Sequence, residues 1–207
     1  MEEPKHKLPL RSSRLESLGD GIFAVAMTIL VIELKWPDLE DDSWNAFASS
    51  FRTVLPSLLC YIISFIVLGI MWFGHRMMFE YIGKTNRHFI YLGVLFYMMV
   101  CLVPLSTQFL AENKLQWGTI MVYGLNLSLC NLTLYAQWVY AIHREGFLER
   151  ELPYEVRKEA KISFLISPVV YAIAVIISIW SPTISIFFFI LTPLLYLIPN
   201  KLDKYMP

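Results

Sequence analysis

Apolar residues run along this chain in long blocks that are separated by short polar connections. Six blocks meet or nearly meet the length of about 20 residues that a helix needs to cross roughly 30 Å of hydrocarbon. They lie near residues 17–36, 53–75, 88–110, 117–142, 161–180 and 183–199. We therefore predict an all-α, polytopic membrane protein whose six transmembrane helices form a single domain over residues 1–207.

Two connections carry further information about the arrangement. The fifth and sixth blocks are separated only by Trp180, Ser181 and Pro182, and a proline opposes continuation of a helix. This predicts a tight reversal and a helical hairpin. The connection 143–161 is polar and mixes both signs of charge, which is typical of a solvated helical elbow. The sixth block is short and contains Pro193 and Pro199.

Composition supports a membrane protein and argues against several functions. Hydrophobic residues make up 57% of the chain, and charged residues only 16%, below the roughly 25% of a soluble domain. The net charge of +0 gives no reason to expect a nucleic-acid partner. The three cysteines lack Cys-x-x-Cys spacing, the four histidines are scattered, and no hydrolase or nucleotide-binding motif occurs. We expect neither an enzyme nor a metal or other cofactor.

The basic residues predict an orientation in the membrane. If the N-terminus is cytoplasmic, only Lys35, Arg52 and Lys114 of the 17 lysines and arginines fall in outer connections. Connections rich in lysine and arginine stay on the cytoplasmic side. We therefore predict that both termini are cytoplasmic.

Charged residues stand at the mouth of the first apolar block. Arg14 and Asp20 are six positions apart, which is poor geometry for a pair within one helix, so we expect their partners on other helices. The segment Arg14-x-x-x-Leu18-Gly19-Asp20 resembles the R-x-x-x-F-S-D signature of the transmembrane protein 175 family of potassium channels. Leu18 and Gly19 depart from that signature. The segment 21–34, the Trp72-Phe-Gly-His75 sequence and Pro104 resemble family members too, whereas Gly93 is nearest to a position that often carries asparagine.

One stripe of the first block combines apolar side chains with a single hydroxyl. Helical spacing places Val25, Thr28, Ile29 and Ile32 on one face. Such a face can pack against neighbouring helices. Alternatively, several copies around a common axis would form stacked apolar rings that block ions by dewetting.

The resemblance implies a role for each of these positions. It implies that the first helix lines the pore, that Val25, Ile29 and Ile32 form its hydrophobic gate, and that Thr28 contributes to potassium preference. It also implies that Arg14 and Asp20 tie this helix to its neighbours. We expect Trp72 and His75 as partners in that network, because both lie at the same predicted membrane edge.

Val122-Tyr123-Gly124 is similar to part of a carbonyl selectivity filter, but it lies inside a predicted continuous helix. A carbonyl filter needs an extended segment, so we reject this match.

The resemblance implies a potassium-permeable, weakly or moderately selective leak channel, assembled as a homotetramer in the lipid of the bacterial plasma membrane. No block carries the regularly spaced arginines of a voltage sensor. Two other functions stay open. A proton- or cation-coupled secondary transporter would use Asp20, and a non-conducting membrane scaffold would use no water path.

Overall fold

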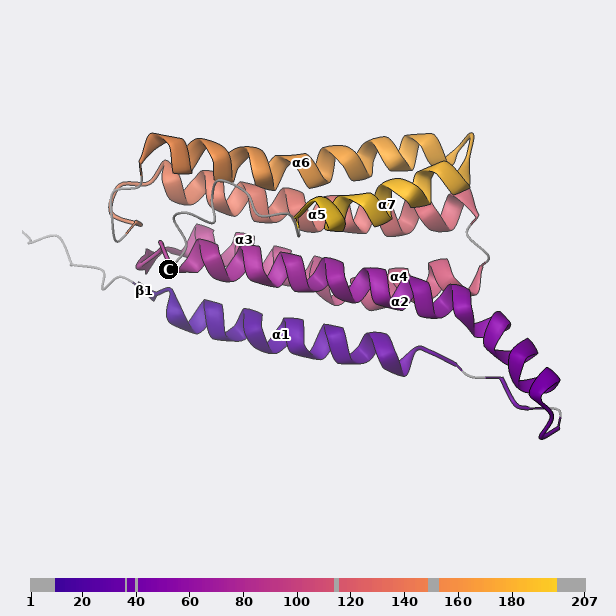
Figure 1. Cartoon of the computed structure of the whole chain (residues 1–207). Helices are drawn as coiled ribbons and strands as arrows, with labels where there is room; N and C mark the ends of the chain where they lie inside the picture. The colour runs from indigo at the N-terminus through magenta and orange to yellow at the C-terminus, as the bar shows by residue number, and fades with distance from the viewer. Residues whose placement is uncertain (1–9, 36, 40, 114–115, 149–152, 197–207) are drawn as a thin grey trace, which may run out of the picture.

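A computed structural model describes residues 10–35, 37–39, 41–113, 116–148 and 153–196, and these residues are almost entirely helical (Figure 1). In chain order, the elements are β1 (Leu10–Arg11), α1 (Ser13–Ile32), α2 (Trp44–Phe79), β2 (Lys84–Thr85), α3 (Arg87–Cys101), α4 (Val103–Glu112), α5 (Trp117–Ile142), α6 (Tyr154–Ser178) and α7 (Pro182–Tyr196). α1 lies along one edge of the bundle and α6 along the opposite edge (Figure 1).

The all-α, polytopic architecture is confirmed. Five spans of the described chain are long and apolar enough to cross a membrane, with α3 and α4 counted together as Arg87–Glu112. The sixth apolar helix, α7, has only 15 residues, which is about 22 Å of helix and less than the thickness of the hydrocarbon core. Residues 197–199 of the predicted sixth span lie outside the described residues.

Several helices begin before the apolar blocks do. The predicted spans start near residues 17, 53 and 161, whereas α1 begins at Ser13, α2 at Trp44 and α6 at Tyr154. A helix can extend past the apolar region when its first backbone N–H groups find partners. At α2, the side chain of Ser43 accepts a hydrogen bond from the backbone N–H of Ala46 at 3.2 Å.

Prolines shape the second and third spans. Pro56 lies inside the 36-residue helix α2, and the first part of α2 bends away from the bundle (Figure 1). A proline inside a helix removes one backbone hydrogen bond and favours such a bend. Pro104 stands in the first turn of α4, just after Leu102 separates α4 from α3. The predicted span 88–110 therefore consists of two consecutive helices, α3 and α4, which together form one span.

Three connections meet at one end of the bundle. β1 precedes α1 and pairs antiparallel with β2, which precedes α3. The backbone N–H of Gly83 donates to the carbonyl of Phe147 at 3.0 Å, which ties the segment after α5 to the same place. The predicted cytoplasmic connections thus share one end. Phe147 is buried there, so this part of the predicted solvated elbow packs against the bundle.

The polar side chains of the fourth span make contacts between helices. Tyr123 of α5 and Ser64 of α2 share a hydrogen bond of 2.9 Å between their hydroxyls, and the Thr107 hydroxyl of α4 donates to Ser64 at 2.9 Å. One turn further along α5, the Asn126 amide donates to the Ser106 hydroxyl at 3.1 Å. Buried polar groups need partners, and this layer supplies them where three helices meet.

The predicted hairpin of α6 and α7 is confirmed. The Ser185 hydroxyl of α7 donates to the backbone carbonyl of Ala174 in α6 at 2.7 Å. The rings of Tyr171 and Phe189 stack with centroids 5.3 Å apart. Ser181 and Pro182 form the reversal between the two helices.

Candidate pore helix and its anchoring network

α1 has one face against the bundle and one face away from it. Its buried residues repeat at helical spacing: Leu15, Gly19, Phe23, Ala26 and Leu30. The four residues predicted to line a pore lie on the other face: Val25 is 57% exposed, Ile29 37% and Ile32 74%, and Thr28 is exposed too. The stripe therefore does not pack inside its own chain, and its apolar surface must be covered by lipid, by other copies or by a narrow pore.

Thr28 presents its oxygen in a defined way. Its hydroxyl donates a hydrogen bond of 2.8 Å to the backbone carbonyl of Val25, so the hydroxyl proton is occupied within α1. The oxygen lone pairs remain available on the exposed face. A ring of such hydroxyls could contact a cation through oxygen atoms.

Asp20 and Trp72 are brought together, whereas Arg14 is apart from them. The Trp72 indole N–H of α2 donates to Oδ1 of Asp20 at 2.8 Å, and both side chains are half-buried. Arg14 is exposed and forms no hydrogen bond or ion pair with any residue that the structure describes. Leu18 is 50% exposed and lies on the same face as Val25, seven positions along α1.

His75 contacts α1 through a residue that sequence reasoning missed, Tyr97 of α3. The Tyr97 hydroxyl donates to the backbone carbonyl of Leu15 at 2.6 Å and lies 2.9 Å from Nε2 of His75. A tyrosine hydroxyl has one proton to give. We assign the second contact as donation from His75 Nε2–H to the Tyr97 oxygen.

The ring of His75 is enclosed by aromatic side chains. Its centroid lies 4.7 Å from that of Phe79, 5.5 Å from that of Phe96 and 6.0 Å from that of Phe23. Its Nδ1 atom is buried and has no hydrogen-bond partner in the described part of the chain. His75 therefore acts as a packed spacer between α1, α2 and α3, and its only described hydrogen bond goes to Tyr97.

Gly19 allows this close approach. A Cβ atom at Gly19 would lie 2.7 Å from Cε1 of His75 and 2.7 Å from the Tyr97 hydroxyl. Distances below 3.0 Å between such atoms force something to move. The family signature has serine where this chain has Gly19. Here the Tyr97 hydroxyl of α3 occupies the space beside Gly19 that a side chain at this position would fill.

Gly93 has a similar function on α3. A Cβ atom there would lie 2.9 Å from Nε2 of Gln137 and 3.1 Å from Cδ2 of Leu15. The Gln137 amide of α5 is buried, and neither of its polar atoms has a partner among the described residues. The small residue lets α1, α3 and α5 meet closely.

The outer end of α1 has its own contact. Lys35 follows α1 and forms an ion pair with Glu112 at the end of α4, with 2.9 Å between Nζ and Oε1. This exposed pair and the Tyr97 and Trp72 contacts hold α1 at both ends, while its middle faces away from the bundle.

The Val122-Tyr123-Gly124 segment lies inside α5, as expected. Tyr123 is buried and hydrogen-bonded to Ser64, and a Cβ atom at Gly124 would clash with Cγ2 of Val175. Its carbonyls are therefore not arranged as an extended filter. Among the described residues, no group of three or more His, Cys, Asp or Glu side chains could hold a metal ion.

Comparisons with known proteins place these features in a family. Residues 14–104 match the family model described as the endosomal/lysosomal potassium channel TMEM175. A potassium channel of Chryseobacterium sp. (strain P1-3) is 30% identical over 93% of this chain and 95% of its own length. A potassium channel of Streptomyces collinus is 28% identical over 79% of this chain and 81% of its own.

Solved structures agree with the fold. The crystal structure of a lysosomal potassium-selective channel TMEM175 homolog from Chamaesiphon minutus superposes with a TM-score of 0.78 at 25% identity, covering 90% of this chain and 96% of that one. A crystal structure of a single-residue variant of the potassium channel MtTMEM175 gives a TM-score of 0.64 at 17% identity, covering 99% of this chain and 100% of that one.

Proposed function

The chain belongs to the TMEM175 family, and from this premise we propose that it forms a potassium-permeable, leak-type cation channel in the bacterial plasma membrane. The observation that carries the proposal is the exposed face of α1. An apolar stripe with one hydroxyl, turned away from its own bundle, is what a pore-lining helix of a symmetric assembly requires.

The proposed pore needs more than one chain. Each chain offers one α1, and one helix cannot enclose a water path, so several copies must surround an axis. We propose a homotetramer with both termini cytoplasmic. The bundle leaves α1 at its edge (Figure 1), where its exposed face is accessible to neighbouring copies.

The proposed gate is a set of stacked apolar rings. From Val25 to Ile32 the α1 axis rises about 10 Å, and the branched side chains at positions 25, 29 and 32 would repeat around the axis. A narrow apolar passage of this kind excludes ions by dewetting. Thr28 would add one ring of oxygen acceptors, because its proton is bonded to Val25.

The anchoring contacts would set the width of this passage. Trp72 and Tyr97 fix the inner half of α1 to α2 and α3, and the Lys35–Glu112 pair fixes its outer end. A shift of α1 relative to these contacts would change the distance between copies of Ile29. Asp20 would therefore position α1 through its bond to Trp72 and would not contact the ion.

Potassium flux from liposomes tests the proposal. Ile29→Asn should wet the constriction, so we expect faster flux and weaker discrimination between potassium and sodium than in the wild-type protein. Ile173→Asn on α6 is the matched control, because Ile173 is 45% exposed and Ile29 is 37% exposed. Absence of flux in both wild type and Ile29→Asn would favour a coupled transporter or a scaffold.

A further inference from the structure

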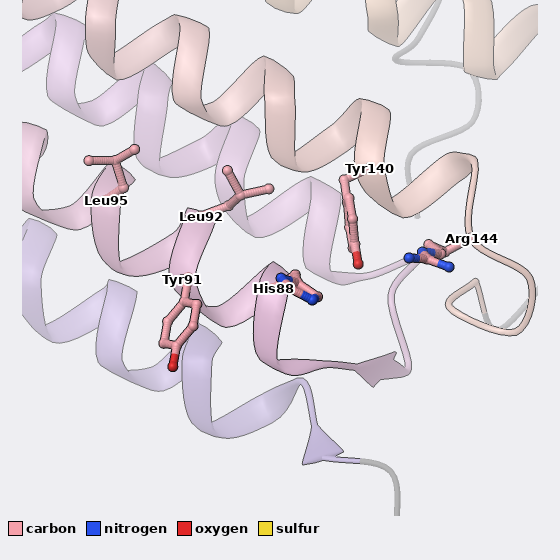
Figure 2. A pocket seen from close by; sticks show the side chains of 6 residues that line it. All are labelled: His88, Tyr91, Leu92, Leu95, Tyr140 and Arg144. Atoms are coloured by element: carbon pink, nitrogen blue, oxygen red, sulfur yellow. The ribbon is translucent and has the colours of Figure 1, made fainter.

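An open hollow of about 530 Å³ lies on the surface between α3 and α5. It is close to the end of the bundle where β1 pairs with β2, which is the predicted cytoplasmic end. Figure 2 shows His88, Tyr140 and Arg144 toward that end, with Leu92 and Leu95 further along α3. Tyr91 completes the lining. None of these residues belongs to the proposed pore or to its anchoring network.

The polar end of the hollow carries uncompensated positive charge. The Arg144 guanidinium lies over the Tyr140 ring, 5.4 Å from its centroid. Arg144 forms no ion pair with a described residue, and no carboxylate lines the hollow. Glu145 neighbours Arg144 in the chain but is not part of the lining.

The adjoining helix end favours an anion as well. His88 is exposed in the first turn of α3, where the helix dipole attracts negative charge. The Arg87 side chain donates from Nε to the Tyr91 hydroxyl at 2.6 Å, and its guanidinium lies 5.4 Å from the centroid of that ring. Arg144 is therefore the arginine of the lining, and Arg87 neighbours the lining residue Tyr91.

The other end of the hollow is apolar and lies toward the middle of the apolar span Arg87–Glu112. Leu92 and Leu95 line it. Met98 and Leu102 follow Leu95 at helical spacing. Leu95 is 40% exposed, Met98 50% and Leu102 42%. The positive end and the apolar strip therefore suit a molecule that joins a negatively charged group to an apolar chain.

We propose that this hollow binds an anionic phospholipid, with its phosphate at Arg144 and His88 and an acyl chain along Leu92 and Leu95. Basic pockets between transmembrane helices at the cytoplasmic membrane surface suit such headgroups. A free phosphate ion would use the cations but would gain nothing from the leucines. The site requires the predicted orientation in the membrane, but it does not require that the protein conducts ions.

Lipid titration of the purified oligomer in neutral detergent tests the site. Bound lipid is counted by native mass spectrometry with phosphatidylglycerol, with phosphatidylcholine and with inorganic phosphate as a competitor. We expect phosphatidylglycerol to bind more tightly than phosphatidylcholine, and Arg144→Gln to weaken its binding about five-fold. Lys158→Gln, which removes an exposed cation of α6 outside the hollow, should leave binding unchanged.

A second variant addresses the apolar end. Leu95→Gln should weaken binding of both lipids, because it makes the strip polar without changing the charge. Equal binding of the two lipids to the wild-type oligomer would overturn the proposal, as would equal effects of Arg144→Gln and Lys158→Gln. Displacement of the lipid by millimolar inorganic phosphate would indicate a free-anion site and would overturn it too. An intact oligomer that retains no lipid would overturn it as well.

Discussion

Replacing Gly19 by serine would test how α1 is held against α2 and α3. A Cβ atom at this position meets Cε1 of His75 and the Tyr97 hydroxyl, both at 2.7 Å, inside a cluster of buried aromatic rings. Overpacking of a closely packed site typically costs about 1–3 kcal/mol. We therefore expect Gly19→Ser to destabilise the folded protein by about 2 kcal/mol, which lowers Tm by roughly 4–8 °C for a chain of this size.

The companion variant Tyr97→Phe separates the two contacts. Alone, it leaves the buried Nε2–H of His75 without its acceptor and should cost about 1–3 kcal/mol. Combined with Gly19→Ser, it removes one of the two close contacts and lets the new hydroxyl accept from His75. The other contact, to Cε1 of His75, remains. We expect the double variant to be about 1 kcal/mol more stable than the sum of the single effects predicts.

Thermal unfolding of the detergent-solubilised protein, in a double-mutant cycle, measures this coupling. Gly19→Ala with Tyr97→Phe is the control, because alanine adds the same Cβ atom without a hydroxyl. Additive effects in the serine cycle would refute the assigned geometry of Gly19, His75 and Tyr97. Equal coupling in the serine and alanine cycles would show that relief of crowding accounts for it and that the serine hydroxyl does not replace that of Tyr97.

Three further outcomes follow from the same contacts. Trp72→Phe should remove the hydrogen bond to the Asp20 carboxylate and destabilise the protein by about 1.5 kcal/mol in thermal unfolding, whereas an unchanged Tm would contradict the anchoring role. Thr28→Val should reduce the ratio of potassium to sodium flux while Thr28→Ser preserves it, and equal ratios for all three proteins would argue against the hydroxyl ring. The hydrogen bond to Glu112 raises the pKa of Lys35, so this contact should persist at neutral pH and weaken only as the pH rises above about 10.4. The Tm difference between wild type and Lys35→Gln should therefore stay constant up to about pH 10.4 and shrink only above it, and a difference that stays constant above that pH would mean that the ion pair does not contribute to it.

The fold could be predicted from the sequence wherever burial in lipid dominates. Each apolar block corresponds to one helix or, for the third block, to α3 and α4, and Trp180 to Pro182 located the hairpin of α6 and α7. The early start of α2 was missed because residues 44–52 do not form an apolar run: polar residues and alanines separate the aromatic side chains of Trp44, Phe47 and Phe51. The break between α3 and α4 at Leu102 was not predicted, because the sequence does not show that Pro104 stands in the first turn of a new helix.

The anchoring network was only half predictable. The position of Trp72 at the same membrane edge as Asp20 predicted their proximity, and the two side chains are hydrogen-bonded. Tyr97 lies in the middle of an apolar block without a motif, and its contact with Leu15 depends on how α3 crosses α1. The predicted partner for Arg14 is absent among the described residues, because its side chain leaves the bundle on the exposed side of α1.

Covalent modification of α1 tests most directly whether its exposed face borders the ion path. Ile32 is the most exposed of the proposed constriction residues, at 74%, and lies at the predicted outer end of α1. Ile32→Cys is prepared with Cys101→Ser, because Cys101 is the exposed native thiol among the described residues. The same background with Ile173→Cys is the control.

Potassium flux from liposomes is then measured before and after a charged, water-soluble thiol reagent is added outside. We expect modification of Ile32→Cys to block flux and the Ile173→Cys control to be unaffected. Unchanged flux from protein whose mass shows complete modification of Ile32→Cys would contradict a pore along this face of α1.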